Sequence, residues 1–167
     1  MDAEYQRRLV EDGFAQLLRR IGEESREIEA EMEGGAVFAR MSGAGGGAEP
    51  YQLKVEAGQY PVGPWRVGFI DPAARGEGRL TLPDHDPRYW PFSGLPGLDG
   101  GFHVSYPGPH RVFVCHPFTA EYFYYHADTR WEPWAYGLER VVIQIGDEVK
   151  KANHFSRWYP LVRTGRL

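Results

Sequence analysis

The stretch QYPVGP at residues 59–64 lies between two segments that alternate apolar and polar side chains, YQLKV at 51–55 and WRVGFI at 65–70. Alternation with a period of two is typical of a strand that buries one face. Pro61 and Pro64 fix φ near about −65° and donate no backbone hydrogen bond, so the chain turns sharply between the two segments. The sequence therefore predicts two antiparallel strands joined by this turn.

A further strand is predicted upstream of this pair. Gly34 and Gly35 interrupt the chain, and AVFARM at 36–41 then forms an apolar run of strand length. The segment SGAGGGA at 42–48 has almost no side chains to order it and is expected to be a loop. Three successive strands with short links predict an antiparallel meander.

Two amphipathic helices are expected to flank the meander. In residues 4–21, apolar side chains recur at the three-and-four spacing of one helical face: Tyr5, Leu9, Val10, Phe14, Leu17, Leu18 and Ile21. The same spacing near the C-terminus predicts a second helix that ends at about Lys151, on Leu138, Val141, Val142, Ile145 and Val149. Residues 25–32 fit either a continued helix or a strand, and we favour the helix.

Residues 72–101 are rich in proline and glycine and are expected to form an irregular insert with one short strand at 80–82. Strand-like runs then return at 102–104 and at 111–115, where Cys115 ends the second run. We therefore expect one α+β domain over residues 1–167, with an N-terminal helix, an antiparallel β-meander and a C-terminal helix.

The charge balance limits the classes of partner. Nineteen basic and 23 acidic residues give a net charge of −4, which provides no field to attract nucleic acid or anionic lipid. No apolar run approaches the length of a membrane span, and the first residues lack the apolar core of a signal peptide. Together with a single cysteine, these features favour a cytoplasmic protein without nucleic-acid or membrane partners.

Read in this order, the elements resemble the ubiquitin-conjugating enzyme fold and its non-catalytic relatives, the enzyme-variant and RWD domains. The resemblance rests on the strand at 51–55, the Tyr60-Pro61 turn with Pro64, and the strand at 65–70. The segments 102–104 and 111–115 look like the family's His-Pro-Asn segment and the strand that leads to its active-site cysteine. Trp131-Glu132-Pro133 and the following helix look like its Trp, Pro and helix element.

Three features depart from the family's pattern. The insert at 72–101 is longer than in typical members, and Cys115 and Trp131 are about twice as far apart in sequence. The family's asparagine near the cysteine is also missing, because Asn153 is the only asparagine of the chain. Divergent bacterial members of the superfamily tolerate such changes, so fold and chemistry are treated separately.

The resemblance implies that Cys115 carries a ubiquitin-like protein as a thioester, received from an activating enzyme and passed to a target amine, with no cofactor. Without the asparagine, His103 is our preferred donor to the oxyanion. Trp131 and Asp128 are expected to border the thiol and the incoming amine, and Glu132 is an alternative to Asp128.

Other interpretations stay open. Cys115 could instead be a buried apolar residue, which would leave a non-catalytic protein-binding adaptor. A metal site is not expected, because the candidate ligands match no standard zinc spacing: Asp84, His85, Asp86, His103, His110, Cys115, His116 and His126. The local signatures of cysteine proteases are absent. The aromatic run at 122–125 is read as core or partner surface rather than as a base-stacking site.

Overall fold

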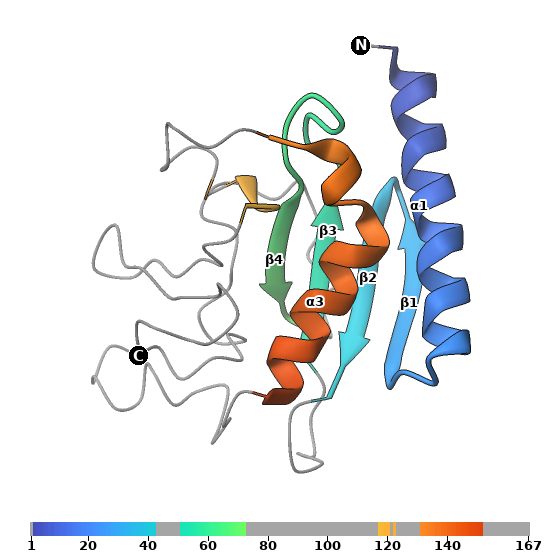
Figure 1. Cartoon of the computed structure of the whole chain (residues 1–167), viewed down its shortest axis with the longest axis vertical. Helices are drawn as coiled ribbons and strands as arrows, with labels where there is room; N and C mark the ends of the chain where they lie inside the picture. The colour runs from blue at the N-terminus through green and yellow to red at the C-terminus, as the bar shows by residue number, and fades with distance from the viewer. Residues whose placement is uncertain (1, 43–50, 73–116, 121, 123–130, 152–167) are drawn as a thin grey trace.

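The computed structural model describes residues 2–42, 51–72, 117–120, 122 and 131–151. Their elements are α1 (Ala3–Glu23), β1 (Ile28–Glu33), β2 (Ala36–Met41), β3 (Tyr51–Glu56), β4 (Arg66–Ile70), the 3-10 turn η3 (Pro133–Ala135) and α3 (Leu138–Lys151) (Figure 1). The predicted α+β layout of N-terminal helix, antiparallel meander and C-terminal helix is confirmed. No helix among these residues combines the length and apolar character needed to cross a membrane.

The four strands form one antiparallel sheet in the order β1-β2-β3-β4, so each strand pairs with its neighbour in sequence. The turn between β1 and β2 consists of Gly34 and Gly35, both with positive φ (58° and 80°). Residues other than glycine rarely adopt this conformation, and two such residues in succession match the twist of a tight hairpin. This hairpin adds β1 to the meander, which therefore has one strand more at its N-terminal end than the sequence predicted.

The predicted continuation of the N-terminal helix through 25–32 is wrong, because residues 28–33 form strand β1. Helix α1 ends at Glu23, and Ser25 then takes a positive φ of 48°, which redirects the chain. Ile28 is buried on the side of the sheet that faces the helices, while alternate glutamates face the other side. Pairing with β2 thus overrides the helical spacing of Ile28 and Met32.

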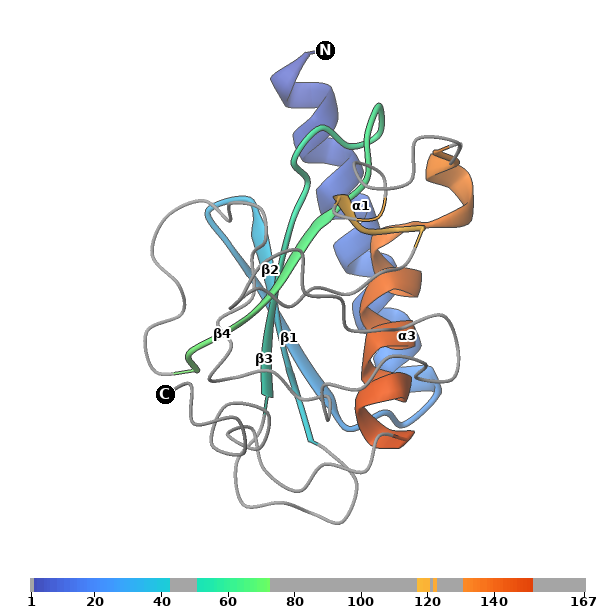
Figure 2. The same ribbon diagram turned by 90° about the vertical axis from the view of Figure 1, so that its left-hand side faces the viewer.

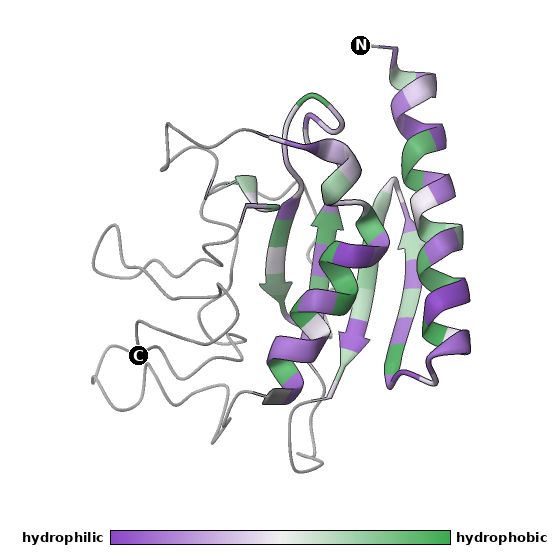
Figure 3. Ribbon diagram, viewed as in Figure 1, coloured by the Kyte–Doolittle hydropathy of each residue, from purple (hydrophilic) through white to green (hydrophobic). Residues whose placement is uncertain are grey.

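Both long helices cover the same face of the sheet (Figure 2). Their apolar stripes pack on alternate strand residues, and the hydropathy colouring of Figure 3 shows hydrophobic residues along the strands and in bands on each helix. The centre of this core consists of Leu17, Val37, Ala39, Leu53, Val55, Val67, Phe69, Val141, Val142 and Ile145. The helices also approach one another closely, since a Cβ at Gly13 would lie 3.0 Å from Leu138 Cβ.

The opposite face of the sheet, here called the outer face, is also partly buried. Its buried side chains are Ala36, Phe38, Gln52, Lys54 and Ile70. The strand alternation predicted that Gln52 and Lys54 would face solvent, whereas they are only 6% and 4% exposed. The polar positions of β3 thus belong to the interior.

The end of α1 carries a network of charged hydrogen bonds. Arg20 and Arg26 both donate to the carboxylate of Glu24, and Arg26 also pairs with Asp147 of α3. Hydrogen bonds from Arg20 and then Arg26 lower the pKa of Glu24. The network links the α1–β1 connection to the second helix.

We expect the contribution of Glu24 to stability to depend on pH. Because the pKa of Glu24 is lower in the folded state, its contribution is present above the ordinary glutamate pKa of about 4.3 and is lost as the pH falls through the lowered value. Urea denaturation of the parent and of Glu24→Gln should differ near neutral pH and converge once the pH falls below the lowered pKa of Glu24. A difference that persists or grows in acid would contradict this assignment.

Candidate functional site

The Tyr60-Pro61 turn connects β3 to β4 and has an ordered backbone. Tyr60 N donates to Ala57 O (2.6 Å), and the amides of Val62 and Gly63 both donate to Gln59 O (2.9 and 3.0 Å). The Tyr60–Pro61 peptide bond is cis. The turn therefore presents its proline carbonyl and its tyrosine ring in defined positions at one end of the sheet.

An aromatic cluster surrounds this turn. Tyr60 stacks on Trp65 with a centroid distance of 4.0 Å, and Trp131 meets Tyr60 edge to face at 6.3 Å. Trp131 in turn stacks on Tyr136 at 5.9 Å. Such offset and edge-to-face pairs stabilise a protein beyond the area that they bury. The cluster joins the turn to the segment that precedes α3.

Two indole hydrogen bonds fix the orientation of these rings. Trp131 Nε1 donates to Pro61 O at 2.7 Å, and Trp65 Nε1 donates to Tyr136 O at 2.8 Å. Each bond links the β3–β4 connection to the segment around η3, 70 or 71 residues away. An indole in the protein interior normally has such a partner. The two tryptophans therefore contribute apolar packing through their rings and a hydrogen bond through their N–H groups.

Residues 117–120 dock on the same cluster. Trp65 forms a parallel bridge with Thr119, and Ala120 N donates to Trp65 O at 2.9 Å. Phe118 is fully buried, with its ring centroid 6.2 Å from that of Tyr136. The chain that follows Cys115 in sequence is thereby anchored beside the start of β4.

The first turns of α1 also form hydrogen bonds with the Tyr60-Pro61 turn. Gln6 Nε2 donates to Tyr60 O at 2.8 Å and to Gly58 O at 3.3 Å. Burial, followed by the nearby charges of Glu139 and Tyr5, raises the pKa of Tyr60. Tyr60 therefore stays a neutral phenol at physiological pH, which suits its place in a stacked aromatic cluster.

Not every apolar side chain near the turn is buried. Val62 is 71% exposed, and Trp134 in η3 is 83% exposed. The segments that carry them are joined by the Trp131–Pro61 hydrogen bond. Tryptophan, together with tyrosine and arginine, is enriched among the residues that contribute most to binding at protein–protein interfaces.

Loss of the Trp131 hydrogen bond alone is expected to have a moderate effect. Trp131→Phe keeps an aromatic ring in the cluster but removes the donor to Pro61 O, so the free energy of unfolding should fall by about 1 kcal/mol. Urea denaturation measures this change. The matched control is Trp134→Phe at the exposed position, and equal stabilities of the two variants would contradict the role given to the hydrogen bond.

Of the four site residues predicted from the sequence, the structure places Trp131 in this cluster. Cys115, His103 and Asp128 lie outside the described residues, as do all six histidines and the predicted strands at 80–82, 102–104 and 111–115. Within the described ranges, no group of three or more His, Cys, Asp or Glu side chains could hold a metal ion.

Sequence reasoning missed three members of the site. Trp65 carries a partial signal, because a tryptophan directly after Pro64 at the start of a strand falls at the end of the turn. Gln6 and Tyr136 carry none, since a glutamine on a helix and a tyrosine before one are ordinary surface residues. Their roles arise from contacts between segments far apart in the sequence.

Comparisons with known proteins identify no relative. No family model matches the chain, and neither the curated proteins nor the solved structures contain a match.

Proposed function

We propose that this chain is a ubiquitin-conjugating-like transferase that carries a ubiquitin-like protein as a thioester on Cys115 and passes it to a target amine. The hydrogen bond from Trp131 Nε1 to Pro61 O carries the proposal. It joins the two described segments that resemble the family's signatures, the Tyr-Pro turn after β3 and the Trp-Glu-Pro segment before α3. The helix–meander–helix order supports the same interpretation.

Cys115 lies close in sequence to one of these anchored segments. Phe118 follows Cys115 by three residues, and three residues of chain span at most about 11 Å. Phe118 is itself packed in the cluster that contains Trp131 and Tyr136. Asp128 likewise precedes Trp131 by three residues in the sequence.

In the proposed reaction, the Cys115 thiolate attacks the C-terminal carbonyl of the ubiquitin-like protein and displaces the activating enzyme's leaving group. The target amine then attacks the thioester carbonyl, and the tetrahedral intermediate expels the Cys115 thiolate as the amide forms. His103 would donate a hydrogen bond to the oxyanion, and Asp128 would accept the proton that the amine loses. The assignment of His103 and Asp128 rests on sequence order.

The experiment is adduct formation with the ubiquitin-like protein, its activating enzyme and ATP. We expect an adduct that thiol reductants cleave in the parent protein, a thiol-resistant ester in Cys115→Ser, and no adduct in Cys115→Ala. An adduct that forms equally well in Cys115→Ala would exclude Cys115 as the acceptor.

A non-catalytic adaptor is the second candidate, and the exposure of Val62 and Trp134 favours it. Such a protein would use exposed apolar side chains to bind a partner without chemistry. Alkylation of the native protein separates the two functions. A Cys115 that resists iodoacetamide, together with the absence of any adduct, would support the adaptor.

A further inference from the structure

Strand β1 lies at one edge of the described sheet, where its strand partner is β2. The two-residue turn makes Glu33 and Ala36 a hydrogen-bonded pair, and such pairs alternate along an antiparallel ladder. Ala30 and Met32 therefore direct their N–H and C=O groups away from β2. Within the described part of the chain, no other segment bonds to these backbone groups. The edge thus offers donors and acceptors at the spacing of a strand.

Helix α1 lies next to this edge (Figure 1). A cavity of about 370 Å³ lies between the first turns of α1, the end of β1 and the Gly34-Gly35 turn. This volume falls within the range of about 300–1,000 Å³ that is typical of binding pockets. Its apolar walls are formed by Ala3, Val10, Met32 and Ala57. Met32 connects the two features, because its backbone lies on the free edge and its side chain, which is 37% exposed, lines the cavity.

A second exposed apolar side chain lies further along α1, on the side that lines the cavity. Leu18 follows the cavity residue Arg7 by eleven positions, which is about three turns, so the two lie on the same side of the helix. Leu18 is 45% exposed. The two residues are about 17 Å apart along the helix axis, which is about the length of β1. An extended segment along the edge can therefore contact both Met32 and Leu18.

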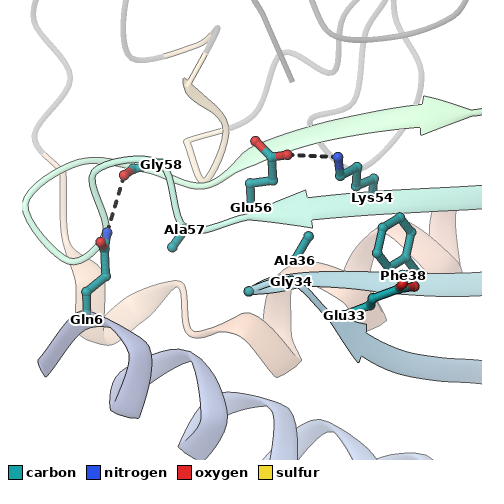
Figure 4. A pocket seen from close by; sticks show the side chains of 10 residues that line it. Gln6, Glu33, Gly34, Ala36, Phe38, Lys54, Glu56, Ala57 and Gly58 are labelled. Carbon is teal, nitrogen blue, oxygen red and sulfur yellow. Dashed lines mark hydrogen bonds and ion pairs between the residues drawn. The ribbon is translucent and has the colours of Figure 1, made fainter. Parts of the chain in front are cut away.

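The charged side chains of this cavity offset one another. Arg7 and Glu11 are the titratable residues that line it, and Arg7 Nε lies 3.6 Å from Glu11 Oε1. The outer side of the same hairpin turn differs, because Glu33, Lys54 and Glu56 line a separate pocket there (Figure 4). An apolar group that entered the outer pocket would desolvate these charged side chains. The cavity beside α1 is therefore the better site for an uncharged apolar side chain.

We propose that β1 and the cavity bind an extended segment of a partner protein as an added antiparallel strand, with uncharged apolar side chains toward α1. The segment pairs its backbone with Ala30 and Met32, and one of its side chains enters the cavity. The balanced charge of the cavity matches such a side chain. A second copy of this chain is a poor occupant, because its β1 would place glutamates opposite Glu29 and Glu31, and carboxylates directly opposite one another destabilise a strand pair. The inference does not depend on the chemistry proposed for Cys115.

The test is an amide NMR titration of the full chain with an acetylated and amidated pentapeptide of alternating serine and leucine, with serine at both ends. We expect this peptide to shift the amides of Ala30 and Met32. Directly opposite residues of an antiparallel pair share a face, so the leucines bond to these two residues. N-methylation of both leucines should therefore abolish binding. N-methylation of the serines between and after them, whose N–H groups point away from β1, is the matched control and should preserve it.

Met32→Gln should raise the Kd of the leucine peptide about three- to tenfold, because it replaces an apolar wall of the cavity by an amide. Val62→Gln, at an exposed apolar position of the β3–β4 connection, is the control and should leave Kd unchanged. The inference is overturned if analogues with lysine or glutamate in place of leucine bind as tightly, or if both N-methylated peptides bind equally. It is also overturned if the amides of Ala30 and Met32 do not shift, or if the two protein variants have the same effect.

Discussion

Trp65→Ala is expected to lower the free energy of unfolding by about 3–5 kcal/mol, the usual cost of truncating a buried large aromatic residue. Trp65 is only 1% exposed and stacks on Tyr60 at 4.0 Å. Its indole N–H satisfies Tyr136 O, and its backbone bridges to Thr119. The substitution therefore removes ring packing and leaves a partly buried carbonyl without its donor. Because the free energy of unfolding of a domain is only about 5–15 kcal/mol, this loss would be a large fraction of the total stability.

Urea denaturation followed by circular dichroism measures the effect, and Trp134→Ala is the matched control. Trp134 is the same residue type in a neighbouring segment but is 83% exposed, so its truncation should change stability by less than about 0.5 kcal/mol. If Trp65→Ala proves too unstable to purify, Trp65→Phe keeps the ring packing and should show a smaller loss. Equal stabilities of Trp65→Ala and Trp134→Ala would contradict the central place given to Trp65.

The turn at residues 59–64 and its two strands could be predicted because their signals are local. Prolines restrict φ within a single residue, and alternation of side chains is visible over five or six positions. Both strands and the C-terminal helix lie within one or two residues of the predicted limits, whereas the N-terminal helix ends at Glu23 rather than continuing through residues 25–32. The α+β class follows from these elements alone.

Strand β1 could not be assigned from residues 25–32 because Ile28 and Met32 satisfy both periodicities. The deciding signal lies just outside the segment, in Gly34-Gly35, since two glycines between alternating segments indicate a tight hairpin. Reading that pair as a hairpin turn rather than as a break would have predicted the fourth strand. A short segment is thus assigned by its neighbour across the turn and not by its own pattern.

The contacts within the aromatic cluster could not be predicted from the sequence. Trp131 could be selected from its resemblance to a family pattern, but its contact with Pro61 is between residues 70 positions apart. Gln6 reaches Tyr60 across 54 positions. No periodicity encodes such pairs, because they depend on how the helices and the sheet end pack together. The sequence indicates which residues are available, and tertiary packing determines which of them meet.

The second large effect is expected at the Lys54–Glu56 pair on the outer face. Lys54→Met keeps a long apolar stem but leaves the Glu56 carboxylate without the ammonium 2.9 Å away. Removal of one member of a buried ion pair costs about 3–5 kcal/mol, because the remaining charge is still desolvated. Both side chains are mostly buried, at 6% and 13% exposed, so solvent screens the pair only weakly.

The double variant Lys54→Met/Glu56→Leu separates the ion pair from the packing. With both charges removed, neither member of this pair stays desolvated without the other, and the loss should be smaller than that of Lys54→Met alone. The exposed pair Lys150–Glu27 is the control, since Lys150→Met should change stability by less than about 1 kcal/mol. If the loss of unfolding free energy in the double variant equals the sum of the losses in Lys54→Met and Glu56→Leu, the two side chains are not energetically coupled. In that case, Lys54 is held in the sheet by its stem and its contact with Phe38 rather than by its charge.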